Sequence, residues 1–376
     1  MKSAFLYSEF FSHYDFGALH PFKTTRAQIV YELCHRYHLL DSPWIEVIKP
    51  EPLPFDQLTL FHDSEYLVLL QAASSKAFAF EMLGCGLGTE ENPVIEGLYT
   101  LISLSAGATY RGAELLAQDE FTLAFNVFGG FHHAGKAHAE GFCYINDVGI
   151  ALSYLIERGF KVACIDLDAH HGNGVQDAFY GDNRVLKISL HESGKTLYPW
   201  SGFETEIGEG AGTGYNINIP LPQGTDDETY LYAFSEIVPP VMDAFAPDIT
   251  IGVFGADTHH TDPLTHLNMS NHSLCRAVNT IAELSPKVLA LGAGGYNVYN
   301  SARTWSLLWA TLNKLEPEDA FLGAVGGMMY GPEAESGSLE KDPLICTSGT
   351  IKNTTHKEVV RVVDSIKGSV FPLLGI

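Results

Sequence analysis

Cysteine is scarce in this sequence and never occurs as a closely spaced pair. The chain of 376 residues contains six cysteines and no CxxC motif: Cys34, Cys85, Cys143, Cys164, Cys275 and Cys346. Thiolate zinc sites and disulfide frameworks both need clustered cysteines. The spacing therefore argues against both, and it predicts reduced, mostly buried thiols.

Long hydrophobic runs are also missing. No segment reaches the roughly 18 consecutive apolar residues that a membrane helix requires. The N-terminal stretch MKSAFLYSEFFSHYDF has only a brief apolar patch, interrupted by Ser8 and Glu9, and lacks the apolar core and cleavage site of a signal peptide. We therefore expect a cytoplasmic protein that does not enter a membrane.

Positive charge is sparse. Against 45 Asp and Glu residues stand 22 Lys and Arg, which gives a formal net charge of −23 at pH 7. Nucleic-acid-binding proteins usually present a basic face, so we expect no nucleic acid partner. An acidic surface can attract cationic substrates such as polyamines or lysine-rich peptides. The simpler interpretation is that acidity serves solubility, because whole-chain charge does not describe the field at one cleft.

The sequence does contain a regular alternation of strand and helix patterns. Near-continuous apolar segments recur at five places, 122–128, 161–167, 184–190, 248–254 and 287–293. Such runs are typical of strands buried on both faces of a parallel sheet. Helical spacing fills intervals between them, for example 148–159 and 227–245. We predict an α/β fold in a single domain (1–376), with a mostly parallel central sheet flanked by helices.

Polar motifs follow the five predicted strands, in chain order GGFHHA, DAHHGN, HES, GADTHH and GGYN. In open α/β sheets, ligands bind outside the carboxyl ends of the strands, so we expect these loops to meet at one site. The glycine-rich stretch 208–214 leads into YNINIPLP, which has a strand pattern. A phosphate-binding loop would open a helix instead, so this stretch is interpreted as a turn.

The DLDAHHGN region carries two carboxylates and an imidazole at alternate positions. Asp166, Asp168 and His170 would project to one side of an extended chain. Together with Asp257 of GADTHH, Asp168 and His170 form an O,N,O ligand set that suits catalytic zinc, and also Fe(II), Co(II) or Mn(II). The alternative is that the aspartates cap a helix and His170 lies at the surface. The neighbouring motifs favour the metal site.

The number of metal ions can be judged from one position. A two-manganese site of the arginase type also uses a DAH segment after a strand. Such a site needs a further aspartate two residues beyond the histidine, to bridge the second ion. This sequence has Gly172 at that position, so we predict one catalytic metal ion.

Proton transfer is assigned to the histidines of GGFHHA. A metal-activated water needs a base, and the leaving group needs an acid. His132 and His133 can divide these tasks if their environments differ. Tyr296 of GGYN can donate a hydrogen bond to a developing oxyanion. A tyrosine in a glycine-rich turn is more often a packing residue, so its assignment depends on the neighbouring motifs.

Together these motifs resemble the zinc-dependent histone deacetylase superfamily. The resemblance covers roughly residues 5–315 and rests on HPFKTTRA, GGFHHAGKAHAEGFCYINDVGIAL, DLDAHHGNGVQDAFY, GADTHHTDPLTHLNMS and GAGGYNVYNSARTW. DPLTHL looks most like the bacterial acetoin-utilisation branch, and GGFHHA is unlike the proline-rich loop of acetylpolyamine amidohydrolases. The resemblance implies the arginase/deacetylase fold, with zinc on Asp168, His170 and Asp257.

The resemblance also implies roles for individual residues. His133 would be the general base and acid, His132 would stabilise charge, and Asp166 would orient His132. Tyr296 would polarise the carbonyl. A potassium or sodium ion would lie beside the strand, at positions matched by Asp166, Asp168, His170, Ser189 and Leu190. The tunnel for the acylated amine would involve Gly141 (through its carbonyl), Phe142 and Tyr198, with Glu91 on the rim, Cys143 nearby and Arg26 near an inner acetate channel.

Three positions depart from the common family pattern. Asn173 stands where class I enzymes carry an aspartate, although class II relatives also have asparagine. An uncharged partner raises the pKa of His133 less than a carboxylate would, which favours the neutral base. Glu91 is longer than the usual aspartate, and Tyr198 replaces the common phenylalanine. These last two changes bear on substrate preference.

The leading interpretation is a zinc-dependent amidohydrolase that removes acetyl or short acyl groups from acyl-lysine. The alternatives are deacetylation of acetylpolyamines or other small acylated amines, which the length of a rim segment at 76–96 would help to distinguish, and a non-catalytic acyl-lysine binder. No ligand, base or tyrosine is missing, which disfavours the binder.

Near the C-terminus, 326–344 has the pattern of a surface loop, and 357–371 that of an amphipathic helix. This helix is expected to pack on the body or on a second subunit of a homo-oligomer.

Overall fold

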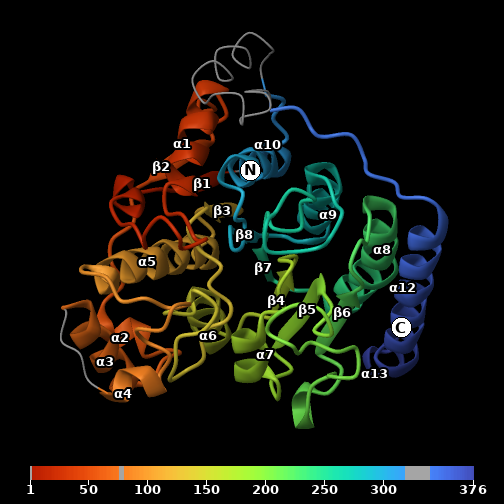
Figure 1. The fold of residues 1–376 in the computed structure, drawn as a ribbon, viewed down its shortest axis with the longest axis horizontal. Coiled ribbons are helices and arrows are strands. Elements are labelled where there is room, and N and C mark those ends of the chain that lie inside the picture. Colours follow the sequence, from red (N-terminus) through yellow and green to blue (C-terminus); the bar gives the residue numbers. More distant parts are fainter. Residues whose placement is uncertain (1, 76–79, 318–338) are drawn as a thin grey trace.

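The chain folds around one eight-stranded sheet. In the computed structural model, which describes residues 2–75, 80–317 and 339–376, the strand order is β2-β1-β3-β8-β7-β4-β5-β6 and neighbouring strands are parallel. The strands are β1 (Ser3–Leu6), β2 (Ile45–Ile48), β3 (Leu123–Asn126), β4 (Val162–Asp166), β5 (Val185–Glu192), β6 (Asn216–Leu221), β7 (Ile249–Val253) and β8 (Val288–Leu291). The predicted α/β fold is therefore confirmed (Figure 1).

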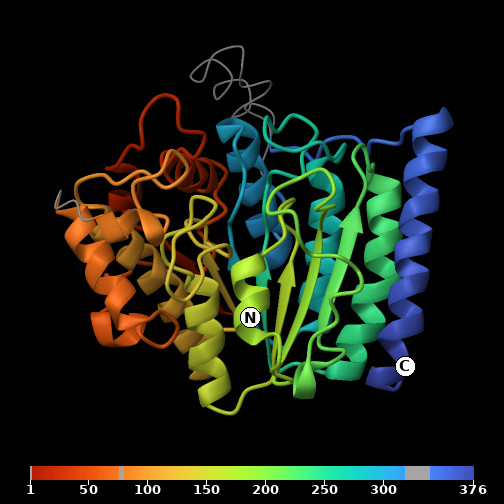
Figure 2. The same ribbon diagram turned by 60° about the horizontal axis from the view of Figure 1, so that its bottom comes forward.

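Helices cover both faces of the sheet (Figure 2). One layer contains α5 (Leu98–Ala117), α6 (Asp147–Glu157) and α7 (Asn173–Phe179), and the shorter α2 (Phe55–Leu58), α3 (Ser64–Ser74) and α4 (Phe80–Gly84) lie at the same end as α5. The other layer contains, in packing order, α1 (Arg26–Arg36), α10 (Val298–Asn313), α9 (Asn271–Leu284) and α8 (Asp227–Phe245). None of the described helices combines the length and apolarity needed to cross a membrane.

The predicted elements agree well with those observed. Strands β3, β4, β5, β7 and β8 are buried along their whole length, which explains why they appear as continuous apolar runs. The strand pattern after the 208–214 turn is β6, and the helix predicted at 227–245 has the bounds of α8. Strands β1 and β2 were not predicted. Both are four residues long, and the edge strand β2 exposes two of its residues to solvent.

The predicted C-terminal amphipathic helix is α12 (Gly349–Ser369). Its buried residues follow helical spacing: Val359, Val362, Val363 and Ile366. This apolar face packs against α8 and the edge strand β6, with the short α13 (Phe371–Leu374) behind it (Figure 1). The helix therefore packs on the body, and it shields an edge of the sheet from pairing with another chain. Most of the loop predicted at 326–344, and 76–79 of the rim segment, lie outside the described residues.

A buried carboxylate ties this C-terminal segment to the start of α8. Asp226 is fully buried and accepts hydrogen bonds from Thr229 N, Thr347 N and Lys352 Nζ, at 3.0, 2.7 and 2.9 Å. Burial alone would raise the pKa of Asp226, but these hydrogen bonds, led by that from Lys352, hold it below its usual value. Asp226 is thus both a helix cap and half of a partly buried ion pair.

Replacing Asp226 with alanine should lower the free energy of unfolding by about 2–4 kcal/mol, because it removes the cap and leaves Lys352 without its buried partner. Urea denaturation followed by circular dichroism measures the change. Asp364→Ala, an exposed substitution on α12, is the matched control and should stay within about 0.5 kcal/mol of wild type. Equal stability of the two variants would show that the Asp226 contacts contribute nothing to holding the segment.

Candidate active site

Four neighbouring strands bring the polar motifs together. The strands β3, β8, β7 and β4 are consecutive in the sheet, and their carboxyl-terminal loops carry the candidate residues. His132 and His133 follow β3, Tyr296 follows β8, Asp257 follows β7, and Asp168 and His170 follow β4. The fifth motif, HES, does not join them. Its Glu192 accepts a hydrogen bond from His266 N at 2.7 Å and so supports the DPLTHL loop instead.

Asp168, His170 and Asp257 form a compact and fully buried cluster. Their ligand atoms all lie within 4.8 Å of one another. His170 Nδ1 lies 2.8 Å from Asp257 Oδ2 and 3.1 Å from Asp168 Oδ1. Two carboxylates and one imidazole, converging without intervening side chains, make an O,N,O donor set that suits one divalent cation.

The charges in this cluster also fit a cation. Burial, and then repulsion by Asp168, raise the pKa of Asp257 to about 7. Burial opposes ionisation of Asp168 as well, but the hydrogen bond from His170 and nearby imidazole charge bring its pKa below the usual value. The two carboxylates raise the pKa of His170 to about 10 despite burial. Two buried carboxylates this close together therefore favour a positively charged group between them, which a divalent cation provides.

Glycines shape the space around the carboxylates. A Cβ atom at Gly255 would clash with Asp168, and one at Gly294 would clash with Asp257 and Asp168. The backbone N–H of Gly294 also donates to Asp168 Oδ2 at 2.6 Å. At Gly172, where a second metal would need an aspartate, a Cβ would clash with Asp166. The donor set and its surroundings therefore fit one ion.

Asp166 is not part of the cluster, because β4 ends at this residue and the chain then bends. The extended spacing that predicted three side chains on one side does not continue past β4. Asp166 Oδ2 accepts from His132 Nδ1 at 2.8 Å, and its Oδ1 accepts from Asp168 N at 3.1 Å. Ser189 pairs with Asp166 across the sheet, and its hydroxyl contacts His191 Nδ1. Leu190 follows it, so the residues predicted around a monovalent ion are neighbours.

The two histidines have opposite electrostatic environments. Burial lowers the pKa of His132, but the Asp166 carboxylate more than offsets this, and the net shift is upward. Burial, together with the charges of His132 and His170, brings the pKa of His133 well below its usual value. His133 Nδ1 lies 2.8 Å from Asn173 Oδ1, and the two Nε2 atoms of the pair are 3.1 Å apart. This geometry fits a neutral His133 that keeps its proton at Nδ1, on Asn173, and has an unprotonated Nε2, with a charged His132 beside it.

Two residues that were not singled out from the sequence hold the GGFHHA loop. Asp147, almost completely buried, accepts from Gly130 N at 3.0 Å and Phe131 N at 2.8 Å. Asn146 caps α6 and donates from Nδ2 to Ala134 O at 2.9 Å. Both lie in the CYINDVG segment that follows the histidines. An Asn-Asp pair before a helical pattern is a local signal for a helix cap, and such a signal does not show that the pair also anchors the preceding loop.

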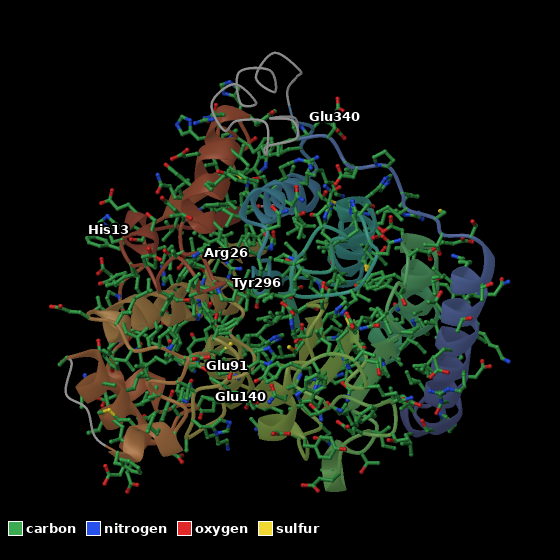
Figure 3. All side chains as sticks on the ribbon, viewed as in Figure 1. His13, Arg26, Glu91, Glu140, Tyr296 and Glu340 are labelled. Carbon is green, nitrogen blue, oxygen red and sulfur yellow. The ribbon has the colours of Figure 1, made fainter. Side chains whose placement is uncertain are left out.

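Tyr296 faces the cluster from the β8 side. Its ring lies 6.2 Å from that of His170 and 5.8 Å from that of Phe142. Asp262, a third residue without a predicted role, accepts from Tyr296 N at 2.8 Å and so fixes the turn. Arg26 is buried beside it and donates to Gly295 O at 3.0 Å (Figure 3). Burial lowers the pKa of Arg26 to about 10, while Tyr296 and Asp168 oppose the shift.

The residues predicted to line the tunnel lie close to the histidines. Gly141, at φ +55°, packs so closely that a Cβ would clash with the His133 ring. The Tyr198 ring lies 5.3 Å from that of His133, and Cys143 Sγ lies 3.3 Å from Gly141 O. A cavity of about 20 Å³ beside Gly141 and Cys143 reaches Asp168 and Tyr296 and has about the space of one water molecule. Glu91 lies near Gly141 at the entrance, and its backbone carbonyl accepts from His20 Nε2 at 3.2 Å.

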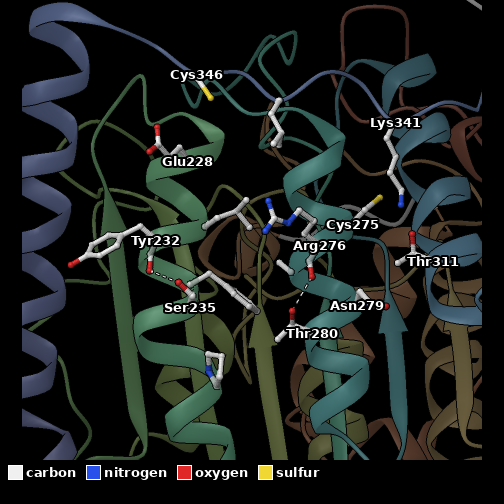
Figure 4. Close-up of a pocket in the computed structure, with 15 residues that line it drawn as sticks. Glu228, Tyr232, Ser235, Cys275, Arg276, Asn279, Thr280, Thr311, Lys341 and Cys346 are labelled. Carbon is white, nitrogen blue, oxygen red and sulfur yellow. Dashed lines mark hydrogen bonds between the residues drawn. The ribbon is translucent and has the colours of Figure 1, made fainter.

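A larger cavity lies elsewhere. It measures about 640 Å³ and is found between α8 and α9, where Tyr232, Cys275 and Arg276 are among its lining residues (Figure 4). None of the candidate site residues lines it. The candidate site residues therefore gather at the small cavity and not at the larger one.

Comparisons with known proteins agree with this geometry. A family model for the histone deacetylase domain matches residues 20–312. The acetoin utilization protein AcuC of Bacillus subtilis (strain 168) is 35% identical over 323 residues, covering 84% of this chain and 83% of that protein. Histone deacetylase RPD3 of Saccharomyces cerevisiae is 33% identical over 317 residues, covering 84% and 72%. A crystal structure of an HDAC homolog from Aquifex aeolicus matches with a TM-score of 0.88 at 32% identity, covering 98% of this chain and 100% of that one. The chain belongs to the histone deacetylase family.

Proposed function

We propose that this protein is a zinc-dependent deacetylase that removes acetyl or short acyl groups from acyl-lysine side chains, with 1–376 acting as one catalytic domain. The observation that carries the proposal is the buried Asp168–His170–Asp257 cluster beside a histidine pair with opposite pKa shifts. A metal site, a neutral base and a charged imidazole together are what hydrolysis of an amide requires. Membership of the deacetylase family supports the choice of bond.

The chain's own residues handle the protons. A divalent ion on Asp168, His170 and Asp257 supplies Lewis acidity, which polarises the acyl carbonyl and lowers the pKa of water. His133 takes the proton of the attacking water at Nε2, because Asn173 holds its Nδ1–H and burial keeps the ring neutral. The same Nε2 then returns the proton to the leaving amine.

Two residues stabilise the charge that develops on the substrate, His132 and Tyr296. His132, kept protonated by Asp166, contributes a positive charge next to His133. The Tyr296 hydroxyl donates a hydrogen bond to the oxyanion. Gly141 accepts the substrate N–H through its carbonyl, Phe142 and Tyr198 enclose the acyl-bearing chain, and Glu91 contacts the substrate at the rim. A potassium or sodium ion beside Asp166, Ser189 and Leu190, and an acetate exit beside Arg26, complete the proposal.

A substrate panel on zinc-loaded protein tests the assignment. It compares a fluorogenic acetyl-lysine peptide, longer acyl-lysines and acetylputrescine, with a hydroxamate as a metal-chelating inhibitor. We expect hydroxamate-sensitive turnover of the acetyl-lysine peptide. Turnover of acetylputrescine alone would replace acyl-lysine by a small acylated amine. Zinc binding without turnover of any compound would contradict the enzymatic assignment and favour a non-catalytic binder.

A further inference from the structure

Glu140 is a carboxylate at the tunnel entrance that the proposed mechanism does not use. It directly precedes Gly141 and Phe142 in the chain. Its Oε1 accepts from the Tyr198 hydroxyl at 2.7 Å, and its Oε2 lies 3.2 Å from His138 Nε2. The side chain keeps 28% of its surface exposed. Glu140 is therefore held in place on one side and open to solvent on the other.

The contact with Tyr198 connects Glu140 to the reacting centre. The Tyr198 ring packs edge-on against His133, at 5.3 Å between ring centroids. A phenylalanine at position 198 would keep this ring contact but would lack the hydroxyl that holds Glu140. The tyrosine thus does more than line the tunnel, because it fixes a negative charge one side chain away from His133.

Glu140 does not act alone at the entrance. Its charge, added to partial burial, raises the pKa of Glu91, while a hydrogen bond from the Gly141 backbone opposes the shift. The two carboxylates therefore lie within electrostatic reach of each other, and both lie below Tyr296 in the view of Figure 3. Burial would raise the pKa of Glu140, but its hydrogen bonds with His138 and Tyr198 bring it below the usual value. The His138 ring is half exposed, so solvent screens this pair and another cation can compete for the carboxylate.

We propose that Glu140, fixed by Tyr198, is a specificity-determining residue that acts with Glu91 to select acylated amines carrying a second positive charge close to the acylated nitrogen. The inference rests on the proposed function and narrows its substrate class. The second charge belongs either to a neighbouring lysine or arginine of a peptide or to the free end of an acylated diamine. Both sources present the same group, a cation. A half-buried carboxylate pair attracts this cation more strongly than fully exposed carboxylates would, because solvent screens the interaction less.

Two matched substrate pairs test the role of the charge. One pair is an acetyl-lysine peptide with arginine or with neutral citrulline beside the acetyl-lysine. The other is acetylputrescine and N-butylacetamide, which lacks the second amine. The readout is the ratio of kcat/KM for the charged over the neutral member. For wild type we expect a ratio of about ten in at least one pair, falling as salt is raised. The pair that shows the ratio identifies the source of the charge.

Variants of the chain then locate the effect. Glu140→Gln should reduce the ratio about five- to tenfold, mainly through KM, and Tyr198→Phe should reduce it about two- to threefold. Glu140→Asp keeps the charge and should restore part of the preference. The control is Glu120→Gln, an exposed residue before β3 at the opposite end of the sheet, which should keep the wild-type ratio. Thermal unfolding of each variant confirms that it is folded.

A wild-type ratio near one in both pairs, or a ratio that Glu140→Gln leaves unchanged, would overturn the inference while leaving the proposed function intact. If none of the four compounds is turned over, the proposed function fails on its own. In that case, calorimetry on zinc-loaded protein gives the dissociation constants of the charged and neutral members of each pair. Their ratio then replaces the kinetic ratio, and the same outcomes support or overturn the inference.

Discussion

Asp257→Asn should abolish metal binding and, as a consequence, catalysis. We expect zinc content to fall from about one per chain to less than about a tenth, and kcat/KM to fall at least about a thousandfold, because the pKa of water then returns towards its bulk value. The reason is geometric as well as electrostatic. Asp257 is one of the three candidate ligands that the described residues offer in this cluster, and an amide oxygen would bring no charge to the ion. Metal analysis and steady-state kinetics measure the two effects.

Stability without metal separates this result from misfolding. Burial and the Asp168 charge raise the pKa of Asp257, so a neutral asparagine removes a repulsion, but it also weakens the pairing with His170. Because the two effects oppose each other, the metal-free variant should unfold at about the same temperature as metal-free wild type. Only wild type, and the exposed control Asp243→Asn, should gain stability on adding zinc, by about 4 kcal/mol at a thousand times the dissociation constant. A fully loaded, active Asp257→Asn would refute the ligand assignment.

Tyr296→Phe should lower kcat by about a hundred- to a thousandfold while zinc content and KM change little. Removal of one hydrogen-bond donor to an oxyanion has an effect of this size. The ring contacts with His170 and Phe142 do not involve the hydroxyl, so the site should keep its shape. The effect is thus confined to the transition state, in which the carbonyl oxygen becomes negative.

A second tyrosine provides the comparison for this variant. Tyr215→Phe, beside the edge strand β6 and packed on Phe245, removes a hydroxyl far from the site and should leave kcat unchanged. Near-normal turnover by zinc-loaded Tyr296→Phe would show that the oxyanion is stabilised elsewhere. Loss of zinc in this variant would instead mean that Tyr296 supports the metal ligands.

The proposed roles of the two histidines also follow from their surroundings, not from their type. His132 and His133 are adjacent in the chain and are both buried, yet one faces the carboxylate of Asp166 and the other the amide of Asn173. Burial lowers both pKa values. The Asp166 carboxylate more than offsets this at His132, whereas the Asn173 amide does not at His133, where the charges of His132 and His170 lower the pKa further. At position 173 the sequence has asparagine where the class I pattern has aspartate. In the structure, Asn173 Oδ1 contacts His133 Nδ1, so Nε2 is the nitrogen of His133 that remains to accept a proton.

Much of this protein was determined by the sequence alone. Continuous apolar runs predicted the central strands, because strands buried on both faces need apolar side chains at every position. Polar residues at the ends of those runs predicted where the metal cluster would be. The apolar spacing at 357–371 predicted a helix, because helical periodicity is a local property. Strand β1 was missed because it lies in the brief apolar patch of the N-terminal stretch, and β2 because two of its four residues are exposed and interrupt the apolar run.

Only the tertiary structure decided which of these local features meet. The chain runs from β3 to β4 but places β8 and β7 between them, so Tyr296 and Asp257 arrive beside histidines more than a hundred residues earlier. The anchoring of the histidine loop by Asp147, and the contact between Tyr198 and Glu140, likewise join distant segments. A single sequence encodes the preferences of each segment, but strand order and side-chain contacts depend on how all segments bury their surfaces together.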